Sequence, residues 1–211
     1  MPTTRLAEST VPRSALGGAG VALGAVLMLA AVVAMPGPWT TGYVSEAGST
    51  GEPLYLAYRA GLVLLAVGVA LIGTELGPVA RALLLVAAVM AGTSGVVPCS
   101  AGCPLPPFEP TTPANVVHTL ASIVGMVLLA LSMAAVAVLP GSDPVTRRLS
   151  AAAFVVMVPP GLWLAWIMLF VGRGQLGANL ERFMLVVAVT WLVGVGVVAV
   201  LRPRSEQDRG E

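Results

Sequence analysis

The sequence predicts an all-α integral membrane protein, a bundle of six transmembrane helices with both termini in the cytoplasm. The chain has 211 residues, of which 57% are hydrophobic and only 10% are charged, and its mean hydropathy is +0.92. Soluble domains carry about 25% charged residues, so most of this surface must face lipid. Six apolar runs approach the roughly 20 residues that cross a bilayer, and the arginines are concentrated on one side of these runs.

The first span is expected at about residues 15–35, after a polar cytoplasmic tail at 1–14. It is longer than the roughly 7–15 apolar residues of a signal peptide, so we expect it to remain as a helix. Gly20 and Gly24 form a small-xxx-small pair that lets another helix approach closely. The loop at 36–54 is rich in proline and glycine and is too polar to cross the membrane.

The other five spans are separated by short polar segments. A tight turn at 75–78 divides the second span from the third, and the stretch 98–118, the longest polar interruption in the chain, leads into the fourth. Pro159 and Pro160 lie at mid-depth in the fifth span and are expected to kink it. We expect these spans at about residues 55–74, 79–97, 114–139, 149–171 and 180–201, followed by a charged cytoplasmic tail at 202–211.

The distribution of arginine predicts the orientation. Cytoplasmic segments carry an excess of Lys and Arg, and all eleven basic residues of this chain are arginines. With both termini in the cytoplasm, eight arginines lie on the inner side and three on the outer side. The inner set is Arg5, Arg13, Arg81, Arg147, Arg148, Arg202, Arg204 and Arg209, and the outer set is Arg59, Arg173 and Arg182.

The composition also bears on location and partners. The exclusive use of arginine and the richness in Ala, Val, Gly and Leu indicate a GC-rich bacterial source, so the predicted location is the bacterial inner membrane. A formal net charge of +1 gives no support for a nucleic-acid partner. The sequence contains no nucleotide-binding loop, and we expect no cofactor. The expected partners are membrane lipids and other membrane proteins.

Both cysteines, Cys99 and Cys103, lie in a predicted outer loop, where thiols are oxidised. Gly102 and the flanking prolines allow the tight turn that a short-range disulfide needs, so we expect a structural disulfide. A catalytic redox pair is the alternative, although the spacing is C-x-x-x-C rather than C-x-x-C. No metal site is predicted, because a structural zinc needs four ligands and this region offers two cysteines and His118.

The only histidine, His118, lies about one turn inside the fourth span. Asn115, His118 and Ser122 recur at helical spacing and share one face. One interpretation is a histidine hydrogen-bonded into the bundle to fix helix packing. The other is a general base or a headgroup ligand, because ionisable groups inside a membrane are costly and often functional.

Three charged residues are expected at a similar depth on the second and sixth spans, namely Arg59, Glu181 and Arg182. An arginine at this depth extends outward or pairs with a carboxylate, and Glu181 or Glu46 is the expected partner of Arg59. These residues form either a structural ion pair between helices or a site in which Arg59 and Arg182 hold a lipid phosphate.

The first outer loop contributes Tyr43, Ser45 and Glu46. Ser45, Glu46 and His118 have the side chains of a hydrolase triad, but a G-x-S-x-G elbow is absent. A serine–histidine dyad that uses Ser94 is the weaker alternative, because a serine in a transmembrane helix usually bonds to its own backbone. Neither pattern predicts a hydrolase.

Together these motifs resemble a known family. The segment Gly42-Tyr43-Val44-Ser45-Glu46 after the first span, Arg59 in the second, the Pro/Cys loop and His118 in the fourth are similar to the bacterial membrane family named "domain of unknown function 998". The resemblance covers about residues 15–201. More distantly, the pattern resembles the superfamily of damage-regulated autophagy modulators and GPI-lipid remodelling proteins. The resemblance implies a six-helix bundle with an outward-facing polar cluster, and for the bacterial family no established reaction.

We therefore expect an extracytoplasmic vestibule in which seven polar residues converge. These are Tyr43, Ser45, Glu46, Arg59, His118, Glu181 and Arg182. In the leading hypothesis the vestibule binds, and in an enzyme would remodel, an outer-leaflet lipid or a lipid-linked substrate.

Each residue has a role in this hypothesis. Arg59 and Arg182 would hold the phosphate. Additional phosphate contacts would come from Tyr43, Ser45 and Asn115. His118, with Glu46 or Glu181, would carry out any acid–base step. The second hypothesis is a non-enzymatic scaffold that assembles other membrane proteins through its glycine-lined helices, and the third is a small transporter.

Overall fold

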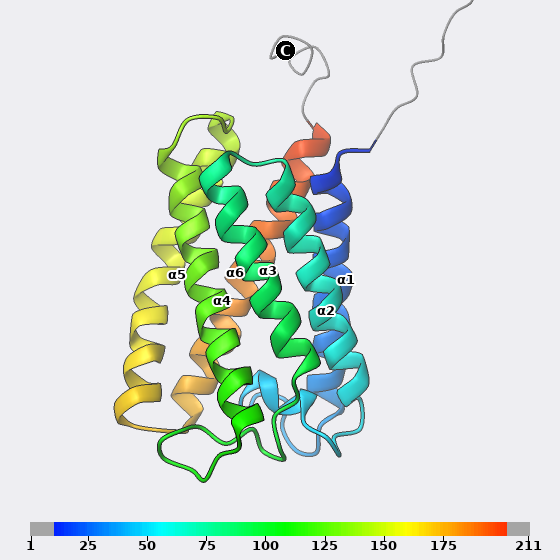
Figure 1. The fold of residues 1–211 in the computed structure, drawn as a ribbon, viewed down its shortest axis with the longest axis vertical. Coiled ribbons are helices and arrows are strands. Elements are labelled where there is room, and N and C mark those ends of the chain that lie inside the picture. The colour runs from blue at the N-terminus through cyan, green and yellow to red at the C-terminus, as the bar shows by residue number, and fades with distance from the viewer. Residues whose placement is uncertain (1–10, 202–211) are drawn as a thin grey trace, which may run out of the picture.

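Each predicted apolar run forms one long helix. A computed structural model describes residues 11–201, so the predicted tails lie largely outside the described part, together with Arg5, Arg202, Arg204 and Arg209. Within that part the chain is all-helical and contains no strand (Figure 1). The elements are α1 (Arg13–Ala34), the 3-10 helix η1 (Val44–Gly48), α2 (Tyr55–Thr74), α3 (Pro78–Val96), α4 (Pro113–Val138), α5 (Pro144–Phe170) and α6 (Gln175–Leu201).

All six long helices have the length and the hydropathy that membrane spans require. Large apolar side chains are exposed on the outside of every one of them. Examples, one from each helix in chain order, are Leu16, Leu56, Val89, Leu120, Leu162 and Val186. An apolar surface of this extent suits lipid and not water, so the predicted class, an all-α multi-pass membrane protein with six helices, is confirmed.

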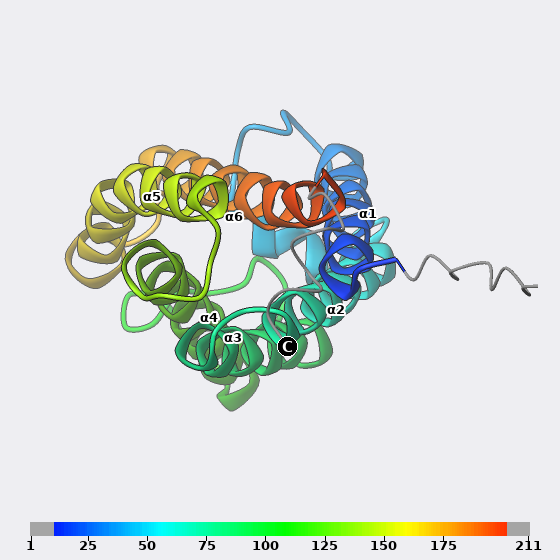
Figure 2. The same ribbon diagram turned by 90° about the horizontal axis from the view of Figure 1, so that it is seen from above.

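The helices form a closed ring in which each packs against its two neighbours in sequence, and α1 packs against α6 to close it. The view along the bundle shows this ring (Figure 2). The α1 start and the α6 end lie at one end of the bundle, here named the terminal end. The η1 segment, the cysteine loop (residues 97–112) and the α5–α6 link lie at the opposite end, named the loop end (Figure 1).

Two helices start earlier than the hydrophobic pattern predicts. α5 begins at Pro144 and not near residue 149, because the Asp143 carboxylate caps it by accepting from the backbone N–H groups of Val145 at 3.0 Å and Thr146 at 2.9 Å. α6 begins at Gln175 and not near residue 180. Polar residues therefore occupy the first turns of both helices.

Small residues set the spacing of α1 and α2. A Cβ atom on Gly24 would lie 2.5 Å from the carbonyl oxygen of Gly61, and one on Gly20 would lie 3.6 Å from the Cα atom of Gly68. The close approach that the glycine pair predicts is thus made inside the chain. In α5 the helix continues through Pro159 and Pro160. The kink expected at these residues stays a prediction.

Candidate functional site

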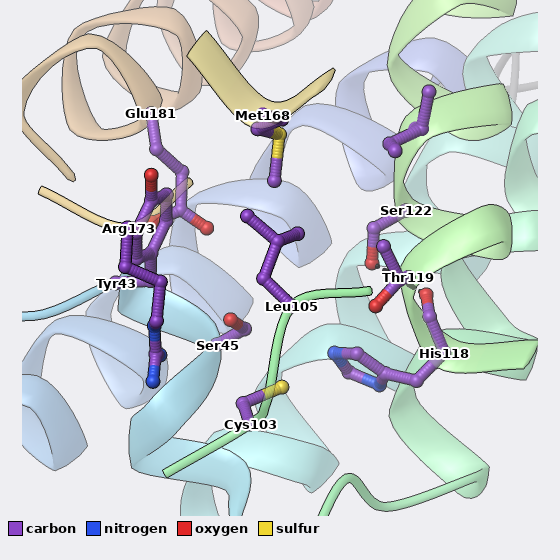
Figure 3. A pocket seen from close by; sticks show the side chains of 11 residues that line it. Tyr43, Ser45, Cys103, Leu105, His118, Thr119, Ser122, Met168, Arg173 and Glu181 are labelled. Carbon is purple, nitrogen blue, oxygen red and sulfur yellow. Dashed lines mark hydrogen bonds between the residues drawn. The ribbon is translucent and has the colours of Figure 1, made fainter. Parts of the chain in front are cut away.

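A small cavity with both polar and apolar side chains in its lining lies at the loop end, between η1, the cysteine loop and helices α4, α5 and α6. Its volume is about 60 Å³, which corresponds to roughly four water-sized sites. Figure 3 shows Tyr43, Arg173 and Glu181 on one side, His118, Thr119 and Ser122 on the other, and Leu105 between them. The cavity is lined by Tyr43, Ser45, Cys103, Leu105, His118, Thr119, Ser122, Ile123, Met168, Arg173 and Glu181.

His118 is held by the end of a neighbouring helix. The last carbonyl groups of a helix have no partner within it, and His118 uses two of them at the end of α3. Its Nδ1 atom lies 2.9 Å from the carbonyl oxygen of Ser94 and 3.0 Å from that of Val97. Because carbonyl oxygens only accept hydrogen bonds, Nδ1 carries the proton. In the neutral ring Nε2 is then a bare acceptor, and it is buried with no hydrogen-bond partner within residues 11–201.

The predicted polar face of α4 faces α3 and the cysteine loop. Ser122 Oγ lies 2.8 Å from Ser94 Oγ. The Asn115 side chain accepts from the backbone N–H of Ser100 at 2.8 Å and donates to its hydroxyl at 2.9 Å. The bonds of Nδ1 to α3 agree with a histidine that fixes helix packing. The unpaired Nε2 atom leaves the other interpretation, a base or a headgroup ligand, open as a prediction.

Two carboxylates on the opposite side of the cavity organise the first outer loop. Glu46 accepts from the backbone N–H of Tyr43 at 2.6 Å, and Glu181 accepts from that of Val44 at 2.6 Å. Arg173 donates to Glu46 at 2.6 Å, and its Nε atom lies 3.7 Å from a carboxylate oxygen of Glu109. Arg173 is thus the arginine that lines the cavity. The carboxylates of Glu46 and Glu109 balance its positive charge.

The phenol of Tyr43 is buried beneath this arginine, whose guanidinium carbon lies 5.5 Å from the ring centroid. Burial raises the pKa of Tyr43, and the nearby carboxylate of Glu181 raises it further. The phenol is therefore neutral near pH 7. A neutral hydroxyl can donate as well as accept a hydrogen bond.

The side chains of Arg59 and Arg182 donate hydrogen bonds to backbone carbonyl groups. Arg59 donates to the carbonyl oxygens of Gly95 at 2.9 Å and Val96 at 2.5 Å, so it caps the end of α3. The expectation that Arg59 pairs with Glu46 or Glu181 is wrong: its bonds go to orphan helix carbonyls, and Glu46 pairs with Arg173.

Arg182 fastens the first outer loop to α6. It donates to the carbonyl oxygens of Gly42 at 2.8 Å and of Trp39 and Thr41 at 3.0 Å each. Neither Arg59 nor Arg182 lines the cavity. The phosphate-binding role suggested for them from the sequence stays a prediction.

Four of the residues predicted to converge line the cavity, namely Tyr43, Ser45, His118 and Glu181. Glu46 does not line the cavity itself, but it pairs with Arg173, which does. Sequence reasoning missed Arg173 and Met168 as members. The only signal for Arg173 was its place among the three outer arginines, in a short link after Gly172.

The cysteines form the predicted disulfide, with their Cα atoms 5.0 Å apart. Gly102 has a φ of +74° and Cys103 has a φ of +47°, so a left-handed turn brings the two residues together. Among the described residues, Cys99, Cys103 and His118 form the one group of three whose potential metal-ligating atoms lie close together, within 4.8 Å of one another.

A family model described as "Protein of unknown function (DUF998)" matches residues 18–198. The match spans most of the chain, so the protein belongs to that family, as the sequence motifs suggested. No curated protein and no solved structure matches the chain.

Proposed function

We propose that this protein binds the polar headgroup of a membrane lipid, or of a lipid-linked molecule, in the cavity at the loop end. It would do so on the outer side of the bacterial inner membrane, as the arginine distribution indicates. The observation that carries the proposal is the bare Nε2 atom of His118, which is buried beside this cavity and has no hydrogen-bond partner among the described residues.

The lining favours a headgroup that donates hydrogen bonds. Nε2 of His118 only accepts in the neutral ring, and the carboxylate of Glu181 accepts as well. The one arginine of the lining, Arg173, is balanced by Glu46 and Glu109, so little positive charge is left to attract a phosphate. A hydroxyl or an ammonium group would satisfy both acceptors.

Access from the bilayer supports a lipid over a water-soluble ligand. Ile123 lines the cavity and is also 41% exposed on the outer surface of α4. Ile123 of α4 and Met168 of α5 therefore give the cavity an apolar margin. Its volume of about 60 Å³ fits a small polar group, so an acyl chain would remain in the membrane.

The same arrangement is compatible with a remodelling reaction. A headgroup hydroxyl bound to Nε2 of His118 would be positioned to lose its proton, since the opposite nitrogen is fixed by two carbonyl groups. The scaffold hypothesis loses its main support, because Gly20 and Gly24 face α2 of the same chain.

Native mass spectrometry with lipid identification tests the proposal. The detergent-purified wild type should retain one lipid class with a hydroxyl or ammonium headgroup, and His118→Ala and Glu181→Gln should lose it. Ser132→Ala is the matched control, because Ser132 lies on the same helix as His118 and bonds only to the backbone at Leu129. Equal lipid profiles in all four well-folded proteins would refute the proposal.

A further inference from the structure

We propose that reduction of the Cys99–Cys103 disulfide creates a binding site for a thiophilic d¹⁰ cation, Zn²⁺ or Cu⁺. The ligands are the two cysteine sulfurs and the Nε2 atom of His118. This site shares His118 and Cys103 with the lining of the headgroup cavity, so the cation and a headgroup would compete for Nε2 of His118. The inference goes beyond the proposed function, and its test uses no lipid.

The three ligands come from two elements that are already in contact. The potential ligand atoms of Cys99, Cys103 and His118 lie within 4.8 Å of one another. In Figure 3 the imidazole of His118 points away from α4 toward the side of the cavity where Cys103 lies. Ligands about 2.3 Å from a tetrahedral ion are roughly 3.8 Å apart, so only small movements would close the site.

The hydrogen bonds of His118 match those of a metal ligand. Histidines that bind metals donate the proton of their other ring nitrogen to a carbonyl or carboxylate group, which fixes the tautomer. Here Nδ1 makes this bond to the carbonyl oxygens of Ser94 and Val97. The remaining nitrogen, Nε2, has no partner although the residue is only 4% exposed. This orphaned acceptor is independent evidence for a ligand.

The burial of the two cysteines and the charge of their thiolates determine which ions this site can bind. Cys99 is 2% exposed and Cys103 is 8% exposed, so a hydrated hard cation such as Mg²⁺ would not find the oxygen ligands it needs. Two thiolates and an imidazole favour Zn²⁺ and Cu⁺. For zinc, three protein ligands leave a fourth position open to water or a substrate, and the adjoining cavity has room for it.

The redox step is ordinary thiol–disulfide exchange. An external dithiol supplies two electrons and two protons to the Cys99–Cys103 bond and becomes a disulfide itself. The two new thiols release their protons when the cation binds as their thiolate complex. Both cysteines and the left-handed turn at Gly102 lie in the loop between α3 and α4, so a movement within this loop would separate the freed sulfurs.

Metal titration of the purified protein tests the site. The protein is reduced with dithiothreitol, freed of reductant without oxygen, and titrated with Zn²⁺ or Cu⁺ in separate arms against a chromophoric chelator. We expect one equivalent to bind to the reduced protein and none to the oxidised protein. The arm with the higher affinity identifies the preferred ion.

Variants give the decisive comparison. The double variant Cys99→Ser/Cys103→Ser should bind no ion, and His118→Ala and His118→Gln should each weaken binding at least tenfold. Ser132→Ala, on the same helix but outside the cavity lining, should bind as the wild type does. Protection of the two thiols from maleimide by the ion gives a second readout in any variant that unfolds in the titration. No binding by the reduced wild type, or an affinity in both His118 variants equal to that of the wild type, would overturn the proposal.

Discussion

The guanidinium of Arg173 donates to the carboxylate of Glu46 at 2.6 Å and joins two segments that are 127 residues apart in the chain. The pair is partly buried, with side-chain exposures of 25% and 19%. Because Glu46 also accepts from the backbone N–H of Tyr43, this one carboxylate ties the α5–α6 link to η1. The wall of the cavity opposite His118 depends on this connection.

Removal of this pair is expected to loosen the loop end. Arg173→Ala should lower the free energy of unfolding by about 1 kcal/mol, since partly exposed ion pairs contribute little more than this. It should also reduce lipid retention, because Tyr43 would lose the cation above its ring. A double-mutant cycle with Glu46→Gln, measured by unfolding in detergent, gives the coupling between the two residues. Strictly additive effects would show that the contact contributes nothing.

A methyl group at Gly177 should displace Tyr43. A Cβ atom there would overlap the phenol oxygen of Tyr43, so Gly177→Ala is expected to push the ring toward the cavity and to reduce lipid binding severalfold. Gly174→Ala is the matched control, because a Cβ atom at Gly174 meets no atom within 4 Å. Tyr43→Phe in the Gly177→Ala background should restore binding in part, since it removes the overlapping oxygen. Equal lipid retention in both glycine variants would contradict this arrangement.

Arg59→Ala should reduce stability and leave the headgroup site intact. Loss of its bonds to the end of α3 is expected to cost about 1.5–3 kcal/mol, the range for a hydrogen bond to a charged group. Arg81→Ala is the control, because within the described part of the chain Arg81 makes one long side-chain hydrogen bond, 3.4 Å, at the terminal end of α3. Unfolding and lipid retention are measured on the same samples. A stable Arg59→Ala protein that has lost its lipid would favour the phosphate-binding role predicted from the sequence.

The helices could be predicted from the sequence because the length of an apolar run is a local property. The α2 helix was predicted at the residues where it is found, Tyr55–Thr74. The starts of α5 and α6 were missed, because helix caps such as Asp143 extend a helix into polar sequence that the hydropathy pattern assigns to a loop.

The partners of the charged residues could not be predicted in the same way. Depth in the membrane suggested that Arg59 would meet a carboxylate, but the free carbonyl groups at the end of α3 lie nearer to it. Periodicity correctly placed Asn115, His118 and Ser122 on one face of α4, since helical spacing is again local. That Arg173 meets Glu46 depends on how the ring of helices closes, which no local pattern encodes.

The orientation of the bundle is the remaining prediction, and it decides which side of the membrane supplies the ligand. The arginine bias places the loop end outside. A membrane-impermeant maleimide should therefore label Thr111→Cys, in the cysteine loop, on intact cells. It should label Pro140→Cys, at the terminal end, only after the membrane is opened. Both positions are exposed, and the native cysteines are protected by their disulfide. The opposite labelling pattern would place the cavity on the cytoplasmic side. There the Cys99–Cys103 disulfide would be reduced, and the reduced form that binds the cation would prevail.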